Sequence, residues 1–392
     1  MPLLNGALEL QPEIAGWRRE LHMHPELLFD THWTAAFVAD KLKAFGCDDV
    51  VTGIGRTGVV GIIRGRHGHG PAVGLRSDMD ALPINETTGK EWSSRIPDKM
   101  HACGHDGHMA MLLGAARHLC ETRNFAGSVA VIFQPAEEGG AGADVMVKDG
   151  LMERFGIASV YGMHSWPGLP VGQFATRPGA LAAAMDVFAI TINGKGGHAA
   201  FPHQTVDPIF IGMQIGMALQ GIVARNADPI ESVVVSITQF HAGDAHNVIP
   251  QSAKLVGTIR SLKQELRDLA VANLRRTAEG IATALGGEAV VSDEGILPYP
   301  VTFNHARETE IAAAAARRVV GHHLVDDKFP PDMGAEDFSF MLNARPGAMI
   351  YAGNGDTAYC HHPAYDFADD AIPYGVSYWV ELTETVLKPE FS

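Results

Sequence analysis

The chain has 392 residues, of which 46% are hydrophobic and 19% are charged. These proportions are typical of a folded globular protein, and the length is enough for two or three domains. Thirty Lys and Arg residues against 45 Asp and Glu residues leave a net charge of −15. Nucleic acid and anionic membrane surfaces are therefore excluded as expected partners, because both would repel the chain.

The four cysteines are few and widely spaced, which argues against a disulfide framework and favours a reducing compartment. They are Cys47, Cys103, Cys120 and Cys360. The N-terminal stretch lacks the basic start and apolar run of a signal peptide, so the sequence predicts a cytoplasmic protein.

The first part of the chain alternates between helical and strand patterns. Apolar residues at helical spacing and short apolar runs follow one another, and such alternation predicts a mostly parallel sheet covered by helices on both faces. The expected helices are 12–27, 31–46 and 108–121, and the expected strands are 57–65, 72–78, 127–134 and 158–166.

The pattern changes near residue 181 and returns near residue 300. Between these points the order strand, helix, strand, strand, helix, strand is that of a ferredoxin-like unit. The expected elements there are 184–196, 206–225, 232–243, 253–262, 263–285 and 288–298, and a helix at 308–321, a strand at 347–354 and a helix near 372–388 follow. The sequence thus predicts an α/β catalytic domain (1–180 and 301–392) with an inserted ferredoxin-like α+β lid domain (181–300).

The segment 208–224 carries no charged residue and is close to the length of a membrane span. Two glutamines lie within it and Asp207 and Arg225 flank it, so we expect a buried or interface helix rather than a transmembrane one.

Residues of metal-ligand type follow the predicted strands. In open α/β sheets, ligands bind beyond the carboxyl ends of the strands. Acidic side chains or histidine follow the strands that end near 78, 134, 164 and 354, and "MHACGHDGH" (100–108) lies at the start of a helix. Joint placement of this kind favours a metal site over separate polar loops.

Each residue alone also has a plainer interpretation. His164 alone could be a hydrogen-bonded core histidine, "QPAEE" a solvated loop, "CHHP" a polar turn and Cys103 an inert thiol. Asp106 could cap the helix that follows it. Four histidines without strand-end context are interpreted as surface residues: His22, His24, His322 and His323.

Nine motifs occur in a characteristic order along the chain. They are "DMDALP", "HACGHD", "QPAEEGGAGA", "GMHSWPGLPVG", "GKGGHAAFPH", "NVIP", "GTIRS", "GAEDFSF" and "HHPAYDF". Together they resemble the metallopeptidase family of aminoacylases and zinc carboxypeptidases. The branch is that of hippurate hydrolases, N-acyl-amino-acid amidohydrolases and auxin-conjugate hydrolases, and the resemblance runs from about residue 10 to 385.

The resemblance implies a site for two divalent metal ions, which could be zinc, manganese, nickel or cobalt. By similarity Asp78 is a carboxylate that orients a ligand histidine. The "HHP" motif selects His361 over its neighbour as a ligand. The implied ligands are Cys103, His105, Glu138, His164 and His361.

The resemblance also implies the reaction. Glu137 would be the general base and His198 would stabilise the oxyanion, often in the site of a dimer partner. Asn247 and Arg260 would hold the free carboxylate of a small N-acyl-amino acid. The expected activity is hydrolysis of the amide bond of that substrate by a homodimer or dimer-based oligomer. Glu336 and Asp337 receive no role.

Three alternatives stay open from the sequence. The same scaffold could carry a dipeptidase or carboxypeptidase. The chain could be a metal-dependent binding protein without turnover. Cys103 and Cys360, each close to a histidine, could instead have a redox role.

Overall fold

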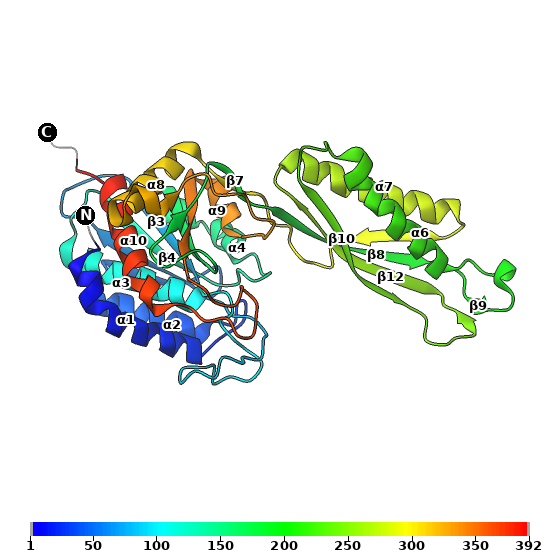
Figure 1. The fold of residues 1–392 in the computed structure, drawn as a ribbon, viewed down its shortest axis with the longest axis horizontal. Helices are drawn as coiled ribbons and strands as arrows, with labels where there is room; N and C mark the ends of the chain where they lie inside the picture. The colour runs from blue at the N-terminus through cyan, green and yellow to red at the C-terminus, as the bar shows by residue number, and fades with distance from the viewer. Residues whose placement is uncertain (1–2, 390–392) are drawn as a thin grey trace. The chain divides into compact units, whose positions relative to one another are not determined.

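The structure is a computed structural model that describes residues 3–389 and divides into two compact units (Figure 1). The large unit contains the chain up to Leu181, Phe303–Pro330 and the chain from Asp337 onward, and the small unit contains Ala182–Thr302 and Pro331–Glu336. Segment 331–336 was expected in the first domain. It belongs to the small unit because its backbone accepts hydrogen bonds there, from the Ala183 N–H to the Gly334 carbonyl at 2.8 Å and from Arg260 Nη1 to the Met333 carbonyl at 3.0 Å.

The large unit is built on a mixed sheet whose centre is parallel. Its strand order is β1-β2-β4-β3-β5-β16-β6-β15. The pairs β4·β3, β3·β5 and β5·β16 are parallel, whereas β1, β2 and β4 pair antiparallel. The strands are β1 (Asp49–Ile54), β2 (Gly58–Arg64), β3 (Ala72–Asp78), β4 (Ser128–Gln134), β5 (Ile157–Trp166), β6 (Phe174–Ala175), β15 (Val325–Asp326) and β16 (Gly347–Gly353).

Helices cover both faces of this sheet, as the sequence predicted. On β4, Val129 and Val131 point to one hydrophobic core and Ala130 and Ile132 to the other, which is the two-residue period of a strand buried on both sides. One core receives α1 (Asn5–Met23), α2 (His32–Phe45), α3 (His105–Thr122), α8 (Ala306–Val320) and α10 (Ile372–Val386), and the other receives α4 (Gly142–Lys148), α5 (Leu151–Arg154) and α9 (Phe338–Ala344).

The small unit is an antiparallel sheet covered by two helices. Its strand order, β10-β12-β8-β13, and its element order are those of the ferredoxin-like unit. A short ribbon of β9 and β11 extends the β8·β12 pair. The elements are β8 (Ala184–Asn193), β9 (Gly197–His198), α6 (Pro208–Gly221), η2 (Ile222–Asn226), β10 (Val233–Ala242), β11 (Val248–Ile249), β12 (Ser252–Ser261), α7 (Gln264–Ala284) and β13 (Glu288–Ser292).

The remaining short elements complete the chain. β7 pairs with β14 in a separate two-stranded sheet. These elements are β7 (Gly179–Ala182), β14 (Thr302–Asn304), and the 3-10 turns η1 (Pro202–Gln204), η3 (His322–Leu324) and η4 (Asp369–Ala371).

The predicted elements differ from the structure most clearly at α1 and β1. The helix expected to start at Pro12 begins at Asn5, and Pro12 lies inside it. Strand β1 was not predicted, because its half-exposed residues show neither clear alternation nor a buried apolar run.

The uncharged helix of the small unit begins where Asp207 caps it, since the Asp207 side chain accepts hydrogen bonds from the backbone N–H groups of Ile209 and Phe210. The helix Pro208–Asn226 is long and apolar enough to cross a membrane by length and composition. It buries Ile211 and Ile215 in the core of the small unit. One side of the helix thus belongs to the core of a folded unit, which agrees with the expected buried or interface helix.

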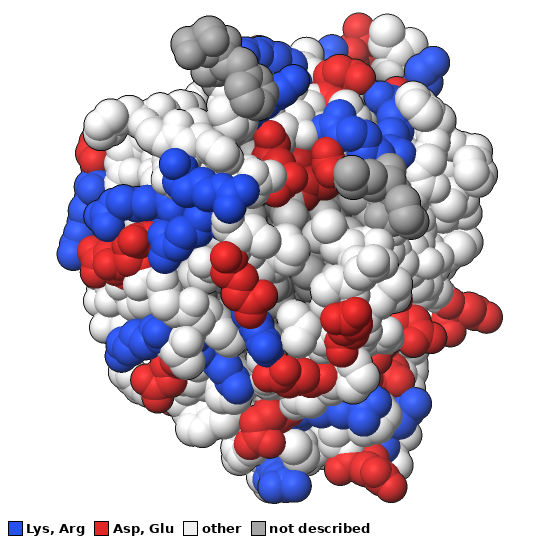
Figure 2. All heavy atoms as spheres, turned by 90° about the vertical axis from the view of Figure 1, so that its left-hand side faces the viewer, with Lys and Arg blue, Asp and Glu red and all other residues white. Residues whose placement is uncertain are grey.

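The face of the large unit near both chain ends carries charges of both signs. Lys and Arg side chains lie beside Asp and Glu side chains over this face (Figure 2). Among the ion pairs of the large unit, Arg117 with Glu13, at 2.8 Å, joins α3 to α1. Because both partners are partly exposed, each such pair contributes well under about 1 kcal/mol to stability.

Candidate metal centre and active site

The start of α3 brings two candidate ligands beside the sheet. Cys103 precedes the helix and His105 is its first residue. Between them Gly104 adopts φ +87°, and a Cβ there would lie 2.4 Å from the Tyr365 hydroxyl and 2.5 Å from Ser165 Oγ. Glycine is required at this position on both counts, since it tolerates the left-handed backbone and leaves room for these neighbours.

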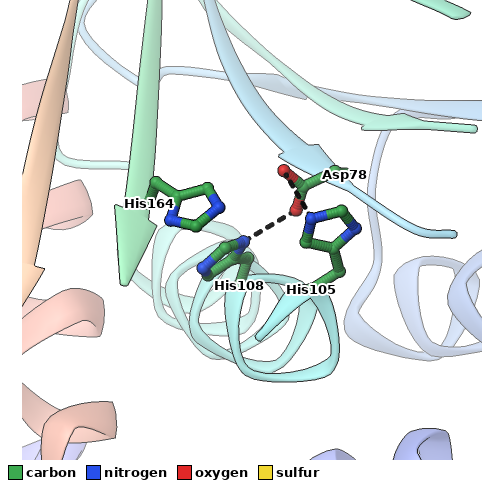
Figure 3. Close-up of side chains that lie close together, drawn as sticks. All are labelled: Asp78, His105, His108 and His164. Carbon is green, nitrogen blue, oxygen red and sulfur yellow. Dashed lines mark hydrogen bonds and ion pairs between the residues drawn. The ribbon is translucent and has the colours of Figure 1, made fainter. Parts of the chain in front are cut away.

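Hydrogen bonds orient the rings of His105 at the start of α3 and His164 on β5, whose centroids lie 6.0 Å apart (Figure 3). His105 Nδ1 lies 2.7 Å from the Asp80 carbonyl, so Nδ1 carries the proton and Nε2 has a lone pair. His164 Nδ1 lies 2.7 Å from the Ser165 carbonyl in the same way. Both rings therefore present Nε2 as an acceptor, which is the arrangement that proteins use to fix a metal-binding imidazole.

The Nε2 atoms face further ligand-type atoms. Cys103 Sγ lies 3.3 Å from His164 Nε2, and His105 Nε2 lies 3.9 Å from Glu138 Oε1. His361 Nε2 lies 3.2 Å from the same Glu138 oxygen. The structure thus gathers all five predicted ligands into one cluster in the large unit.

The cluster has an unmatched polar atom that a bound cation would satisfy. His105 Nε2 is buried and has no hydrogen-bond partner among the described residues, and the buried Glu138 Oε1 has the ion-pair contacts with His361 and His105 given above. Ligand atoms of Cys103, Glu138 and His361 lie within 4.8 Å of one another, as do those of His105, Glu137 and Glu138. Thiolate, imidazole and carboxylate donors fit a zinc-like divalent ion, and Glu138 belongs to both groups.

Asp80 holds the Glu137–Glu138 pair in place. Its Oδ1 accepts the Glu137 backbone N–H at 2.9 Å, and its Oδ2 accepts that of Glu138 at 3.1 Å. Through its carbonyl it also orients His105. Burial and the charge of Glu138 raise the pKa of Asp80 well above its usual value, although the two N–H groups oppose the shift. One residue therefore positions the expected base and two expected ligands.

Asp78 lies between two histidines of the cluster. The resemblance implies that it orients a ligand histidine, and its Oδ1 accepts from His108 Nδ1 at 2.7 Å (Figure 3). His108 Nε2 in turn accepts the Ser165 backbone N–H at 2.8 Å. With both ring nitrogens bonded to protein, His108 is a support for the cluster. Asp78 Oδ2 lies 3.6 Å from His105 Nε2, so the carboxylate still borders the cluster.

A buried arginine balances this carboxylate. Arg76 Nη1 donates to Asp78 at 2.9 Å and Arg76 Nη2 to Asp337 at 3.1 Å. Burial raises the pKa of Asp78, but its contacts with His105, His108 and Arg76 outweigh burial and hold that pKa well below its usual value. Asp337, which had no assigned role, therefore anchors Arg76, and it also accepts the Ala143 backbone N–H at 2.9 Å.

Unusual backbone geometry marks two of the ligand loops. His361 has φ +67°, and Ala136, directly before the glutamate pair, has φ +56°. Non-glycine residues in this region are strained by roughly 1–2 kcal/mol. The His361 N–H donates to the Ala102 carbonyl at 2.7 Å, which ties the His361 loop to the Cys103 loop.

The expected substrate residues of the small unit do not come together. His198 lies in β9 and pairs with Val248 of β11. Asn247 is the residue directly before Val248. Arg260 lies near the other end of β12, and eight residues of strand from Ser252 span roughly 26 Å. The structure thus places His198 and Asn247 beyond the Ser252 end of β12 and Arg260 near its other end.

The local contacts of His198 and Arg260 suit polar recognition. The Ala200 N–H donates to His198 Nδ1 at 3.1 Å, so a neutral His198 presents Nε2–H as a donor. Burial lowers the pKa of Arg260, and Asp332 opposes this shift. Its guanidinium remains charged at neutral pH.

Sequence reasoning missed several supporting residues, and two interpretations were wrong. His22, interpreted as a surface residue, is buried and lies 2.8 Å from Asp106. Asp106 does not cap α3, since Gly104 occupies that position. The sequence does indicate Asp80 and His108 through the "DMD" and "HDGH" motifs. Asp80 stands two residues after Asp78, and His108 stands three residues after the predicted ligand His105.

The α/β fold and this cluster define a metal-dependent hydrolase of amide bonds, and the known relatives agree. The chain belongs to Peptidase family M20/M25/M40, whose family model matches residues 74–385. It is 38% identical over 388 residues to a hippurate hydrolase of Campylobacter jejuni, covering 99% of this chain and 100% of that protein. It is 41% identical over 355 residues to thermostable carboxypeptidase 2 of Saccharolobus solfataricus, covering 90% and 88%.

A solved structure supports the same assignment. A Bacillus subtilis protein described as a dinuclear metal binding peptidase from the M20 family superposes with a TM-score of 0.83. The two sequences are 35% identical, and the match covers 98% of this chain and 100% of that one. The prediction of family, fold class and amide-hydrolase activity is confirmed.

Proposed function

We propose that the protein hydrolyses the amide bond of N-acyl-amino acids of the hippurate type and releases a carboxylic acid and a free amino acid. The observation that carries the proposal is the cluster of five ligand-type residues, which ranges from the buried His105 to the exposed His361, with Glu137 held beside it by Asp80. The identity with a hippurate hydrolase over the whole chain supports the substrate class.

The cluster fits two divalent ions, with Glu138 and Cys103 central to it. The proposed ligands are Cys103, His105, Glu138, His164 and His361. Ions held by these residues would supply Lewis acidity, which polarises a carbonyl group and lowers the pKa of a water molecule so that hydroxide is available near neutral pH. The donor set suits zinc, and manganese, nickel and cobalt remain candidates.

The chain's own groups then move the proton and hold the substrate. Glu137 takes a proton from the attacking water and delivers it to the departing amine nitrogen. His198 donates its Nε2–H to the oxyanion, and Asn247 and Arg260 hold the free carboxylate of the amino acid.

A complete substrate site requires a second copy of the chain. Within one small unit, roughly 26 Å separates Arg260 from the end that carries His198 and Asn247, and no N-acyl-amino acid spans that distance. We therefore propose a homodimer in which one copy supplies His198 and Asn247 to the site of the other. The four cysteines, all free thiols, support a cytoplasmic location.

The test compares two adjacent carboxylates. Turnover of hippurate, N-acetyl-amino acids and dipeptides is measured for metal-stripped protein and for protein given back Zn²⁺, Mn²⁺, Co²⁺ or Ni²⁺. Glu137→Gln should retain the bound metal and lose kcat on the order of a hundredfold to ten-thousandfold. Glu138→Gln, as the matched control, should lose metal as measured by mass spectrometry. Full activity of Glu137→Gln would contradict its role as the base.

A second candidate is a carboxypeptidase or dipeptidase, which the 41% identity with a thermostable carboxypeptidase favours. Higher kcat/KM on dipeptides than on hippurate and N-acetyl-amino acids would establish it. Tight metal binding without cleavage of any of these substrates would instead indicate a binding protein.

A further inference from the structure

Two cysteines outside the metal centre lie in contact with each other. Cys47, between α2 and β1, and Cys120, in the last turn of α3, have their sulfur atoms 3.6 Å apart. Both are free thiols and they are 73 residues apart in the chain. A disulfide needs the sulfur atoms about 2.05 Å apart, so bond formation requires the two sulfur atoms to approach by about 1.5 Å.

The backbone on either side of this pair is fixed. Arg123, just after α3, donates to Asp48 at 2.7 Å and to the Gly46 carbonyl at 2.8 Å, and these two residues flank Cys47. The Cys47 N–H also donates to the Leu42 carbonyl at 3.2 Å, as at the end of a helix. The hydrogen bonds between Arg123 and the residues on either side of Cys47 therefore keep the two thiols in contact.

Gly61 of β2 packs close to the Cys47 side chain. A Cβ on Gly61 would lie 3.5 Å from Cys47 Sγ and closer still to Val131 and Leu42. A larger residue at this position would therefore crowd the dithiol.

The two thiols differ in access and in acidity. Cys47 is partly exposed, whereas Cys120 is buried with 8% of its surface exposed. The hydrogen bond from Cys47 lowers the pKa of the Cys120 thiol, and the positive charge of Arg123 acts in the same direction. The hydrogen bond with Cys120 and burial raise the pKa of the Cys47 thiol. Cys47 is therefore assigned the first attack because it is the accessible thiol and not because of its acidity, and the buried Cys120 is the resolving thiol.

We propose that Cys47 and Cys120 form a redox-active dithiol that low-molecular-weight disulfides such as oxidised glutathione convert to an intramolecular disulfide. Cys47 thiolate attacks the glutathione disulfide, forms a mixed disulfide and releases one glutathione thiolate. Cys120 thiolate then attacks the Cys47 sulfur and releases the second. The two cysteines lose two protons and two electrons, and one oxidised glutathione becomes two reduced molecules. The product fastens the end of α3, the helix that begins at His105, to the start of β1.

The experiment treats zinc-loaded protein with oxidised glutathione and follows each cysteine by acid quench, differential alkylation and peptide mass spectrometry. We expect a peptide pair linked between Cys47 and Cys120 and only transient glutathione on Cys47. In Cys47→Ser, oxidation of Cys120 should slow at least tenfold, because the accessible thiol is gone. In Cys120→Ser, glutathione should stay on Cys47.

Two results would overturn the proposal. One is a wild-type protein in which glutathione remains on Cys47 while Cys120 stays reduced. The other is equal oxidation of Cys120 in the wild type and in Cys47→Ser. Reduction with dithiothreitol should restore both thiols, and amide hydrolysis by both serine variants should equal that of the wild type, since neither cysteine belongs to the metal centre.

Discussion

At the scale of single residues, His22 is a buried histidine that two carboxylates hold in its charged form. It lies 2.8 Å from Asp106 and 3.3 Å from Glu86. Burial lowers its pKa, but the two carboxylates outweigh burial and raise the pKa from 6.5 to about 9. The protonated form is thus favoured in the folded protein, and the ion pairs it makes tie α1 to the start of α3.

This shift predicts a loss of stability on the alkaline side. Since the folded pKa is above the unfolded one, the contribution is complete below pH 6.5, declines between 6.5 and 9, and is lost above about 9. Its size is roughly 3 kcal/mol. Urea unfolding of metal-stripped protein near pH 6 and near pH 9.5 should show a larger difference for the wild type than for His22→Gln.

The control for this experiment is His24→Gln, two residues away on the partly exposed side of the helix end. It should keep the pH dependence of the wild type. An unchanged pH dependence in His22→Gln would show that other groups cause the alkaline loss.

Gly104 gives a second prediction at this scale. Gly104→Ala combines a left-handed backbone with a Cβ 2.4 Å from the Tyr365 hydroxyl, whereas Gly150→Ala has a similar φ of +83° and nothing within 4 Å. The control variant should cost about 1–2 kcal/mol. Gly104→Ala should cost about 1–3 kcal/mol more, because the neighbours must move. Urea unfolding measures both, and equal losses would mean that the neighbours adjust without strain.

At the scale of elements, the sequence predicted those with clear periodicity. Strand β3 was predicted with its actual bounds, because it is a short apolar run that is buried throughout. Strand β1 was missed because it is half exposed, and α4 and α5 were missed because short helices between turns carry little periodic signal.

The exposed face of α6 in the small unit predicts where the two copies of the proposed dimer meet. On α6 the side chains of Phe210, Met213 and Met217 are 47%, 48% and 75% exposed, and the neighbouring β10 is an edge strand of the sheet. An apolar helix face beside an open edge is a suitable dimer surface. Met217→Lys should therefore weaken the proposed dimer at least tenfold in sedimentation experiments.

The matched control is Val290→Lys on β13, the opposite edge strand, where the side chain is 49% exposed. It should leave the association constant unchanged. If Val290→Lys dissociates the dimer and Met217→Lys does not, the contact lies on the other edge.

At the scale of the whole molecule, the two-unit organisation predicts how metal affects stability. All proposed ligands belong to the large unit. Because a ligand stabilises only the unit that binds it, chelation should lower the melting temperature of the large unit and leave that of the small unit unchanged. Calorimetry of metal-loaded and chelator-treated protein, with Glu138→Gln as the metal-free reference, measures this. A matching shift of both transitions would mean that the units unfold as one.

Much of the candidate site was predictable because its residues lie near the end of a strand, shortly after one or at the start of a helix, as His164, Glu138 and His105 do. The supports were less predictable, since they depend on distant partners. Arg76 reaches Asp337 across 261 residues, and no local pattern indicates that contact. The separation of His198 from Arg260 likewise appears only once the length and direction of β12 are known.

The position of β16 has a consequence for synthesis on the ribosome. This strand lies between β5 and β6 although it comes after the whole small unit in the chain, and His361 follows it. A nascent chain that has not reached Gly347 leaves one edge of β5 open and lacks part of the cluster. Such an intermediate exposes an apolar strand edge of the kind that chaperones bind. Any product of premature termination before His361 would therefore lack one proposed ligand, however well its first half folds.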